Sequence, residues 1–145
     1  MRRLFALIVV TVAALLLASC EGGFTATGSS TKSQFSRNSG WLEASYNKAN
    51  GSTSLYLLEE VESSGGDSLE GVILEVDVTL AVGAGSFTIE LLGEDDAVTL
   101  TLEARDGQTV SGQGQCVLDV FGDARYRVTA VEAENVDYRM DYRFQ

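Results

Sequence analysis

Apolar side chains recur at every second residue in Val72-Ile73-Leu74-Glu75-Val76-Asp77-Val78-Thr79-Leu80. Successive side chains of a β-strand point to opposite faces, so this period of two predicts a strand. One face carries Val72, Leu74, Val76, Val78 and Leu80. The other face carries Ile73, Glu75, Asp77 and Thr79. A strand with one apolar and one largely polar face is typical of an antiparallel sheet that packs on a second layer.

The same alternation on both sides of this stretch predicts further strands. Three segments show it clearly, and their apolar positions are Phe87, Ile89 and Leu91, then Val98, Leu100 and Leu102, then Val136, Tyr138, Met140, Tyr142 and Phe144. Weaker strand patterns cover residues 41–47, 53–61, 108–112, 115–121 and 125–131. No helix of useful length is expected. Eight or nine short strands in roughly 105 residues predict an all-β domain at residues 41–145. We expect a single antiparallel, jelly-roll-like β-sandwich, with a small up-and-down β-barrel as the alternative.

Glycine, asparagine and aspartate between these strands predict how neighbouring strands connect. Residues 93–96 are expected to close the strand at 86–92 onto residues 97–104. Residues 105–107 are expected to form a three-residue loop, with Gly107 at the position that needs a positive φ. That loop would place Leu102 opposite Val110.

Two more hairpins are expected towards the C-terminus. A turn at residues 133–135, with Asn135 in the left-handed region, would set Arg127 opposite Asp141. A turn at residues 122–124 would place Leu118 opposite Val128 and direct Cys116 into the core, as a small inert hydrophobic residue. The Asp/Arg alternation of residues 137–143 would protect an edge strand with charge. The interleaved aspartates would neutralise the arginines of the last two strands, which are Arg125, Arg127, Arg139 and Arg143.

The composition excludes several classes of function. The 145 residues include no histidine, no proline and two cysteines, and the formal net charge is −11. A chain without histidine has no Ser-His-Asp triad, Cys-His dyad or His-rich zinc site. Its acidity argues against nucleic acid as a partner, because phosphates would be repelled. We therefore expect a protein that is not an enzyme and that needs no cofactor.

The first twenty residues carry a targeting pattern. Arg2 and Arg3 precede an apolar run from Leu4 to Leu17, which ends in the sequence Leu17-Ala18-Ser19-Cys20. About fourteen apolar residues suit the h-region of a signal peptide better than a membrane span, which needs ~20. This segment resembles a bacterial lipoprotein signal, whose motif is a leucine, two small residues and a cysteine.

The resemblance implies that residues 1–19 are a signal peptide cut off before Cys20, whose thiol receives a diacylglycerol and whose new amine can be acylated. These acyl chains would be the only non-protein group. The protein would then be exported and anchored to a bacterial membrane, facing the periplasm or the exterior. Because Glu21 rather than aspartate follows the cysteine, the resemblance favours the outer membrane where there are two.

A tether is expected between the lipid and the domain. Twelve of the nineteen residues at 22–40 are Gly, Ser or Thr, which buries too little apolar surface to fold. Residues 20–40 are therefore interpreted as a lipidated cysteine with a flexible tether that reaches about 25 Å. The removed segment holds two of the ten Lys and Arg residues and none of the 21 acids, so the mature net charge becomes −13.

Two groups of residues are candidate sites, and each has a plainer interpretation. Glu94, Asp95 and Asp96 crowd one turn and could offer oxygens to calcium, but acidic turns usually serve solvation. Trp41, Tyr46 and Tyr56 could form an aromatic platform for sugar rings, but aromatic residues in strands more often fill cores.

Two functions remain after these exclusions. The first is a non-enzymatic accessory role, in which the lipid-anchored domain binds another envelope protein. The alternative is a ligand-binding module, for a glycan or for calcium, displayed at the cell surface. A large exposed apolar patch on one sheet would favour the first, and an exposed aromatic patch the second.

The lipidation prediction can be tested directly. The substitution Cys20→Ala removes the thiol that receives the lipid, so labelling with radioactive fatty acid should be lost and uncleaved precursor should accumulate. Labelling and cleavage at the wild-type level in Cys20→Ala would show that the protein is not anchored in this way.

Overall fold

A computed structural model describes residues 23–59, 61 and 68–145, and it consists of antiparallel β-strands. The elements are β1 (Thr25–Thr27), β2 (Ser30–Ser36), β3 (Ser39–Leu58), β4 (Ile73–Leu92), the 3₁₀ turn η1 (Glu94–Asp96), β5 (Val98–Arg105), β6 (Thr109–Val117) and β7 (Ala124–Phe144). The expected all-β sandwich is confirmed. The described part of the chain holds seven strands rather than eight or nine, because three of them are about twice the expected length.

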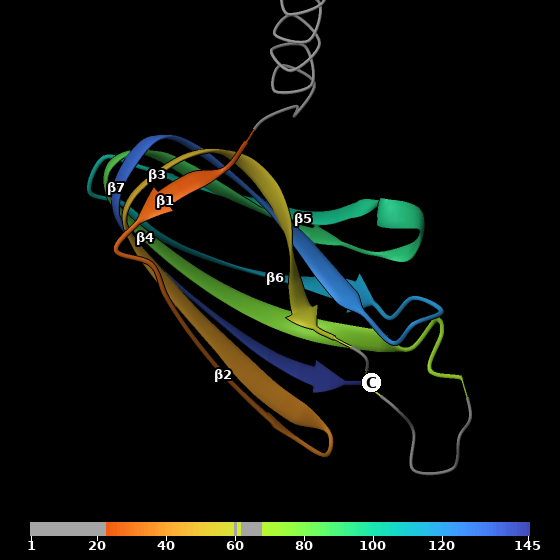
Figure 1. The fold of residues 1–145 in the computed structure, drawn as a ribbon. Coiled ribbons are helices and arrows are strands. Elements are labelled where there is room, and N and C mark those ends of the chain that lie inside the picture. The colour runs from red at the N-terminus through yellow and green to blue at the C-terminus, as the bar shows by residue number, and fades with distance from the viewer. Residues whose placement is uncertain (1–22, 60, 62–67) are drawn as a thin grey trace, which may run out of the picture.

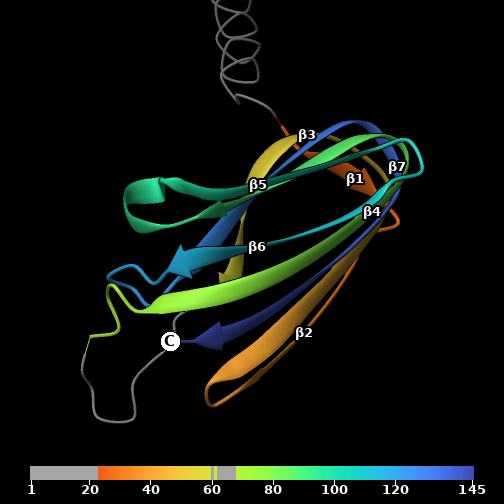
Figure 2. The ribbon, with the colours of Figure 1, turned by 180° about the vertical axis from the view of Figure 1, so that it is seen from behind.

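The three long strands β3, β4 and β7 belong to both layers of the sandwich. β7 lies between β3 and β4 and pairs with each along most of its length. All three strands bend midway, so that each contributes one half to either layer (Figures 1 and 2). Layer A consists of β2, the first half of β3, the second half of β7, the first half of β4, and β6. Layer B consists of the second half of β3, the first half of β7, the second half of β4, and β5. β1 pairs with β3 at the bend itself, along Lys48–Asn50.

The bend depends on β-bulges, in which residues adopt positive φ and one strand gains a residue over its neighbour. The register of β3 against β7 shifts at Gly51, where φ is 98°, and that of β4 against β7 shifts at Gly85, where φ is 73°. On β7 the bend carries Glu132 and Asn135, with φ values of 46° and 52°. The turn between β5 and β6 holds this region, because the Gly85 amide donates to Asp106 Oδ1 over 2.7 Å.

The core contains most of the apolar positions that the alternation predicted, although Val98 is 45% exposed. Leu74, Val76, Val78 and Leu80 are all at most 1% exposed. Between the layers lies a group of tyrosines centred on Tyr138. Its hydroxyl oxygen lies 2.9 Å from that of Tyr126 in layer B and 3.3 Å from that of Tyr46 in layer A. Burial raises the pKa of Tyr126 and Tyr138, so both stay neutral at physiological pH.

The expected tether is wrong for the residues that the structure describes. β1 and β2 lie within residues 20–40 and pair with β3 along Lys48–Asn50 and Ser39–Ser45. All seven residues of β2 are exposed, so its Ser- and Thr-rich composition is that of an edge strand with little to bury. Phe24 also fixes the segment, because its ring packs edge-on against Tyr46 at 5.5 Å. Residues 20–22 lie outside the described residues.

The predicted hairpin around residues 133–135 is also wrong. Asn135 does have positive φ, but it lies in the bend of the single strand β7. Arg127 forms an ion pair with Glu90 over 3.1 Å, and Asp141 pairs with Arg139. Since β7 lies between β3 and β4, its Asp/Arg alternation does not protect an edge. A left-handed asparagine serves a bulge as well as a turn, so the local pattern did not distinguish them.

Of the other turns, one predicted pairing is confirmed and two are wrong. Residues 93–96 do close β4 onto β5, with Leu91 opposite Leu100. Gly107 has positive φ, but Leu102 and Val110 are not paired, because β5 and β6 each pair with a different half of β4. For the same reason Leu118 does not face Val128. Matching the apolar faces of two strands is possible for strands that are far apart in sequence as well as for consecutive strands, so this criterion alone did not identify the pairs.

The bend can be tested with two glycines of nearly equal φ. A Cβ on Gly85 would lie 2.1 Å from the Glu132 carbonyl oxygen, whereas a Cβ on Gly107 would meet nothing within 4 Å. Gly107→Ala should lower the free energy of unfolding by about 1–2 kcal/mol through φ alone. Gly85→Ala should lower it by about 1–3 kcal/mol more, because the backbone of β7 must move. Equal losses in urea unfolding would show that the bend tolerates a wider approach of β4 and β7.

Candidate functional site

The outer face of layer A is a grid of polar side chains in cross-strand rows. Each row takes one residue from β2, β3, β7, β4 and β6 in that order. The rows are Ser30, Ser45, Asp137, Ala81 and Thr109, then Lys32, Glu43, Arg139, Thr79 and Ser111, then Gln34, Trp41, Asp141, Asp77 and Gln113. The rows follow from the alternation that buries the other face of each strand.

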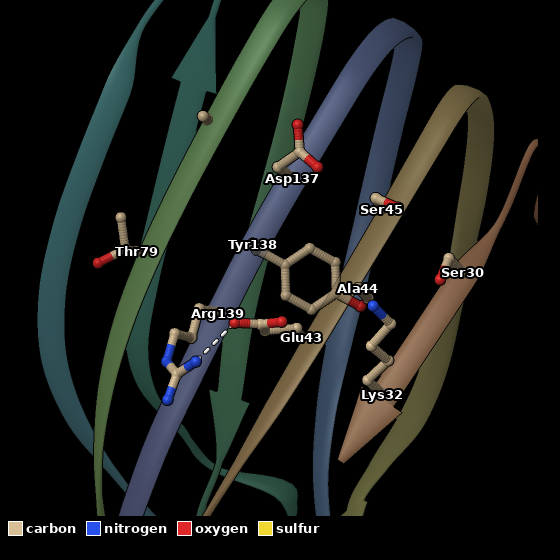
Figure 3. A pocket seen from close by; sticks show the side chains of 10 residues that line it. Ser30, Lys32, Glu43, Ala44, Ser45, Thr79, Asp137, Tyr138 and Arg139 are labelled. Atoms are coloured by element: carbon tan, nitrogen blue, oxygen red, sulfur yellow. Dashed lines mark hydrogen bonds and ion pairs between the residues drawn. The ribbon is translucent and has the colours of Figure 1, made fainter.

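A hollow of about 430 Å³ lies on this face over the first two rows (Figure 3). Small side chains leave the space, notably Ser45 and Ala81. Charged side chains surround it, and they are Lys32, Glu43, Asp137 and Arg139. Figure 3 shows Asp137 on β7 and Lys32 on β2, with β3 between them. The hollow is therefore polar, open to solvent and bounded by both signs of charge.

Arg139 is held in one orientation beside the hollow. Its guanidinium donates to Glu43 Oε1 over 2.5 Å and to both carboxylate oxygens of Asp141 over 2.8 Å. These bonds keep the pKa of Asp141 below its ordinary value and raise that of Arg139. The guanidinium also lies 4.9 Å from the ring centroid of Trp41, whose Nε1 donates to Gln34 Oε1 over 3.3 Å. This network presents a preorganised array of donors and acceptors.

Lys32 and Asp137 differ from this network. Within residues 23–59, 61 and 68–145, neither side chain has a hydrogen bond or an ion pair. Both are exposed, and both line the hollow. The hollow thus combines a fixed guanidinium–carboxylate array with one ammonium and one carboxylate that stay available to a ligand.

The structure does not bring the three candidate aromatic residues together. Trp41 lies on the outer face of layer A, where Arg139 covers its ring. Tyr46 is 7% exposed and lies in the core. Tyr56 is 47% exposed and pairs with Arg125 in layer B. The common aromatic platform is therefore wrong, because strand parity and the bend send the three rings to different surfaces.

The acidic turn lies at the end of the sandwich away from the bend (η1, teal in Figure 1). Glu94, Asp95 and Asp96 line a hollow of about 320 Å³, and Asp96 accepts from Arg125 over 2.7 Å. Among the described residues, no group of three or more acidic or thiol side chains is arranged to hold a metal ion. The arrangement gives no geometric support to the calcium hypothesis.

Cys116 lies in the core, as predicted. It is 0% exposed, and its Sγ lies 3.5 Å from the Arg125 carbonyl oxygen. Burial raises the pKa of its thiol to about 12. A neutral, inaccessible thiol is a poor nucleophile.

The four arginines of β7 are neutralised, but three of them bind acids from other strands or turns rather than the interleaved aspartates. Arg125 pairs with Asp96, Arg127 with Glu90 and Arg143 with Glu75. Arg139 pairs with the interleaved Asp141 and also with Glu43 on β3. Sequence reasoning missed the hollow itself. The sequence predicted that its polar residues on β3, β4 and β7 face solvent. It did not predict that Ser30 and Lys32 belong to a strand, because they lay in the expected tether. It also did not give the order of the strands, which decides which polar residues are neighbours.

Exposed large apolar side chains are scattered over the described surface. They are Phe35 on β2, Tyr56 on β3, Val98 on β5, Val120 and Phe121 in one loop, and Val131 on β7. They come from five segments in both layers. No sheet face among the described residues therefore offers the broad apolar patch that would favour the accessory role.

No family model and no curated protein matches the chain. Among solved structures, it is 13% identical to one described as Bacillus endospore appendages, a novel family of disulfide-linked pili, with a TM-score of 0.44 over 87% of this chain and 93% of that chain. It is 16% identical to a xylan-binding domain from Paenibacillus barcinonensis Xyn10C, with a TM-score of 0.38 over 85% of each chain. It is 13% identical to a carbohydrate-binding module from Cellvibrio mixtus lichenase 5A, with a TM-score of 0.36 over 82% of this chain and 88% of that chain. These values describe a remote likeness of fold.

The described residues contain no helix long and apolar enough to cross a membrane.

The buried thiol predicts an alkaline loss of stability. In the unfolded chain Cys116 ionises near its ordinary pKa of 9, whereas in the folded protein it ionises at about 12. Its contribution is thus complete below pH 9 and falls by up to about 1.4 kcal/mol per pH unit as the pH rises towards 12. Urea unfolding from pH 8 to 10 should show this slope, and Cys116→Ala should flatten it. Parallel curves for the two proteins would place the thiol in contact with water.

Proposed function

We propose that this chain is a lipid-anchored protein of the bacterial cell envelope whose β-sandwich binds a glycan on the outer face of layer A. It binds without catalysing a reaction. The observation that carries this proposal is the hollow in which Lys32 and Asp137, neither paired with another described residue, lie beside the fixed array of Glu43, Arg139 and Asp141.

A glycan suits this chemistry better than an apolar ligand. Each sugar hydroxyl both donates and accepts, so it can pair with carboxylate oxygens and with the guanidinium or the ammonium. The size of about 430 Å³ lies within the ~300–1,000 Å³ of small-molecule sites. An apolar ligand would remove water from Lys32 and Asp137 and return no hydrogen bonds, at a cost of several kcal/mol.

The anchor and the absence of catalysis rest on the sequence. Leu17-Ala18-Ser19-Cys20 supports lipidation of Cys20, and the lack of histidine supports a binding role. On the face itself, Arg139 holds the pKa of Asp141 below its ordinary value, which makes that carboxyl a poor proton donor.

An accessory role remains the second candidate for the same anchored protein. Its specific support is the loop in which Val120 and Phe121 are 60% and 73% exposed, since adjacent exposed apolar side chains suit protein contact. We favour the glycan because this loop covers one tip, whereas the polar hollow spans four strands.

Two aspartates on one face provide a matched test of glycan binding. Asp137 lines the hollow, and Asp77 is another exposed aspartate of layer A that lies outside it. Titration of mature protein with oligosaccharide fragments of bacterial cell wall should show binding. Asp137→Asn should raise the dissociation constant about tenfold or more, because a hydrogen bond to a charged group contributes about 1.5–3 kcal/mol. Asp77→Asn should leave it unchanged.

Two outcomes would refute the glycan proposal. One is the absence of binding to any wall fragment. The other is equal weakening by Asp137→Asn and Asp77→Asn, which would indicate a general charge effect. Capture in intact cells of a single envelope protein, lost on Phe121→Ser, would favour the accessory role.

A further inference from the structure

The chain enters the folded domain at the bend. The Gly23 carbonyl oxygen lies so close to Gly51 that a Cβ there would be 2.4 Å from it. Phe24 then packs on Tyr46, and Thr25 pairs with Asn50. From residue 23 onwards the backbone is therefore fixed to the bulge of β3.

This entry point leaves almost no tether. Three peptide units separate Cys20 from Gly23, and they span at most about 11 Å. A lipid on Cys20 inserts its acyl chains into the bilayer next to the cysteine itself. The bend must then lie within about 11 Å of the lipid headgroups, whereas a tether of twenty residues would have allowed about 25 Å of free movement.

The short link holds the bend near the membrane but does not hold the far end of the sandwich there. The halves of the long strands run about ten residues from the bend, at ~3.3 Å per residue, and so carry the far loops about 30 Å away. That distance applies to η1 and to the loop of Val120 and Phe121, opposite the bend in Figure 1.

The charge distribution agrees with this orientation. At the far end one hollow is lined by Arg125 and six acidic residues, which are Glu70, Glu94, Asp95, Asp96, Asp119 and Asp123. The hollow at the bend has Lys48 against three acidic residues, which are Asp106, Glu132 and Glu134. Anionic headgroups repel the far end more strongly. The bend also exposes an apolar side chain, Val131, at 57%.

We propose that the bend is a membrane-facing surface that rests on the lipid headgroups, with the acidic loops pointing away. This inference rests on the proposed lipidation of Cys20 and is independent of the glycan. It places the hollow of layer A close to the bilayer, since Asp137 follows the bulge residue Asn135 by two positions.

Quenching by spin-labelled lipid measures the orientation. Full-length lipidated protein carrying Cys116→Ala is placed in vesicles of phosphatidylethanolamine and phosphatidylglycerol that contain a headgroup nitroxide lipid. A fluorophore is attached to Val131→Cys or Lys48→Cys at the bend, or to Phe121→Cys at the far end. Quenching at residues 131 and 48 should exceed that at residue 121 several-fold. Fifteen Gly and Ser residues inserted between Gly22 and Gly23 should abolish the difference.

Mass spectrometry of the same samples separates this inference from the anchor. A chain without the lipid mass refutes the anchor and with it the orientation. A lipidated chain with equal quenching at both ends, or with stronger quenching at residue 121, refutes the orientation alone and leaves the anchor standing.

Discussion

The bend across β3, β4 and β7 determines how the two layers, the N-terminal segment and the polar face are arranged. A central strand with partners on both sides can turn sharply only where bulges relieve the ladders, and here Gly51, Gly85 and Asn135 supply the positive φ. The consequence is clearest on β7, where Tyr126 and Tyr138 lie on one strand and yet face each other from opposite layers. Their hydroxyl oxygens are 2.9 Å apart, so the strand forms a hydrogen bond across the core with itself.

The alternation predicted most of the buried side chains, because the parity of a strand residue decides which face of the sheet its side chain lies on. It did not predict where strands end, because a bulge and a turn use the same residues. Ala133-Glu134-Asn135 satisfies both, and only the continuous ladders of β7 with β3 and β4 decide between them. Composition failed at residues 25–36 for a related reason. An edge strand that buries little needs no apolar residues, so its sequence is like that of a flexible segment.

The polar face shows the same limit at the level of the site. The solvent-facing position of each polar residue was predictable from the alternation. A site, however, depends on which residues lie side by side, and this depends on the order of the strands in the sheet. Lys32 and Asp137 are about a hundred residues apart in sequence, and they line one hollow because both β2 and β7 pair with β3. The neutralisation of the four arginines of β7 was predictable from the charge balance. Their partners were not predictable, since Arg139 pairs with Glu43 on β3 as well as with Asp141 on its own strand.

The bulges also connect the fold with the proposed membrane setting. The start of the folded chain lies against Gly51. Asn135 lies two residues before Asp137, which belongs to the cross-strand row with Ser45 and Ala81. The entry point and the hollow are therefore neighbours of one bend rather than independent features of the surface. Any substitution that moves the bend changes the approach of the layers, the direction of the N-terminal segment and the position of the hollow together. Under the proposed lipidation of Cys20, three residues before the described chain begins, the bulges that fold the sheet would also set which surface meets the membrane.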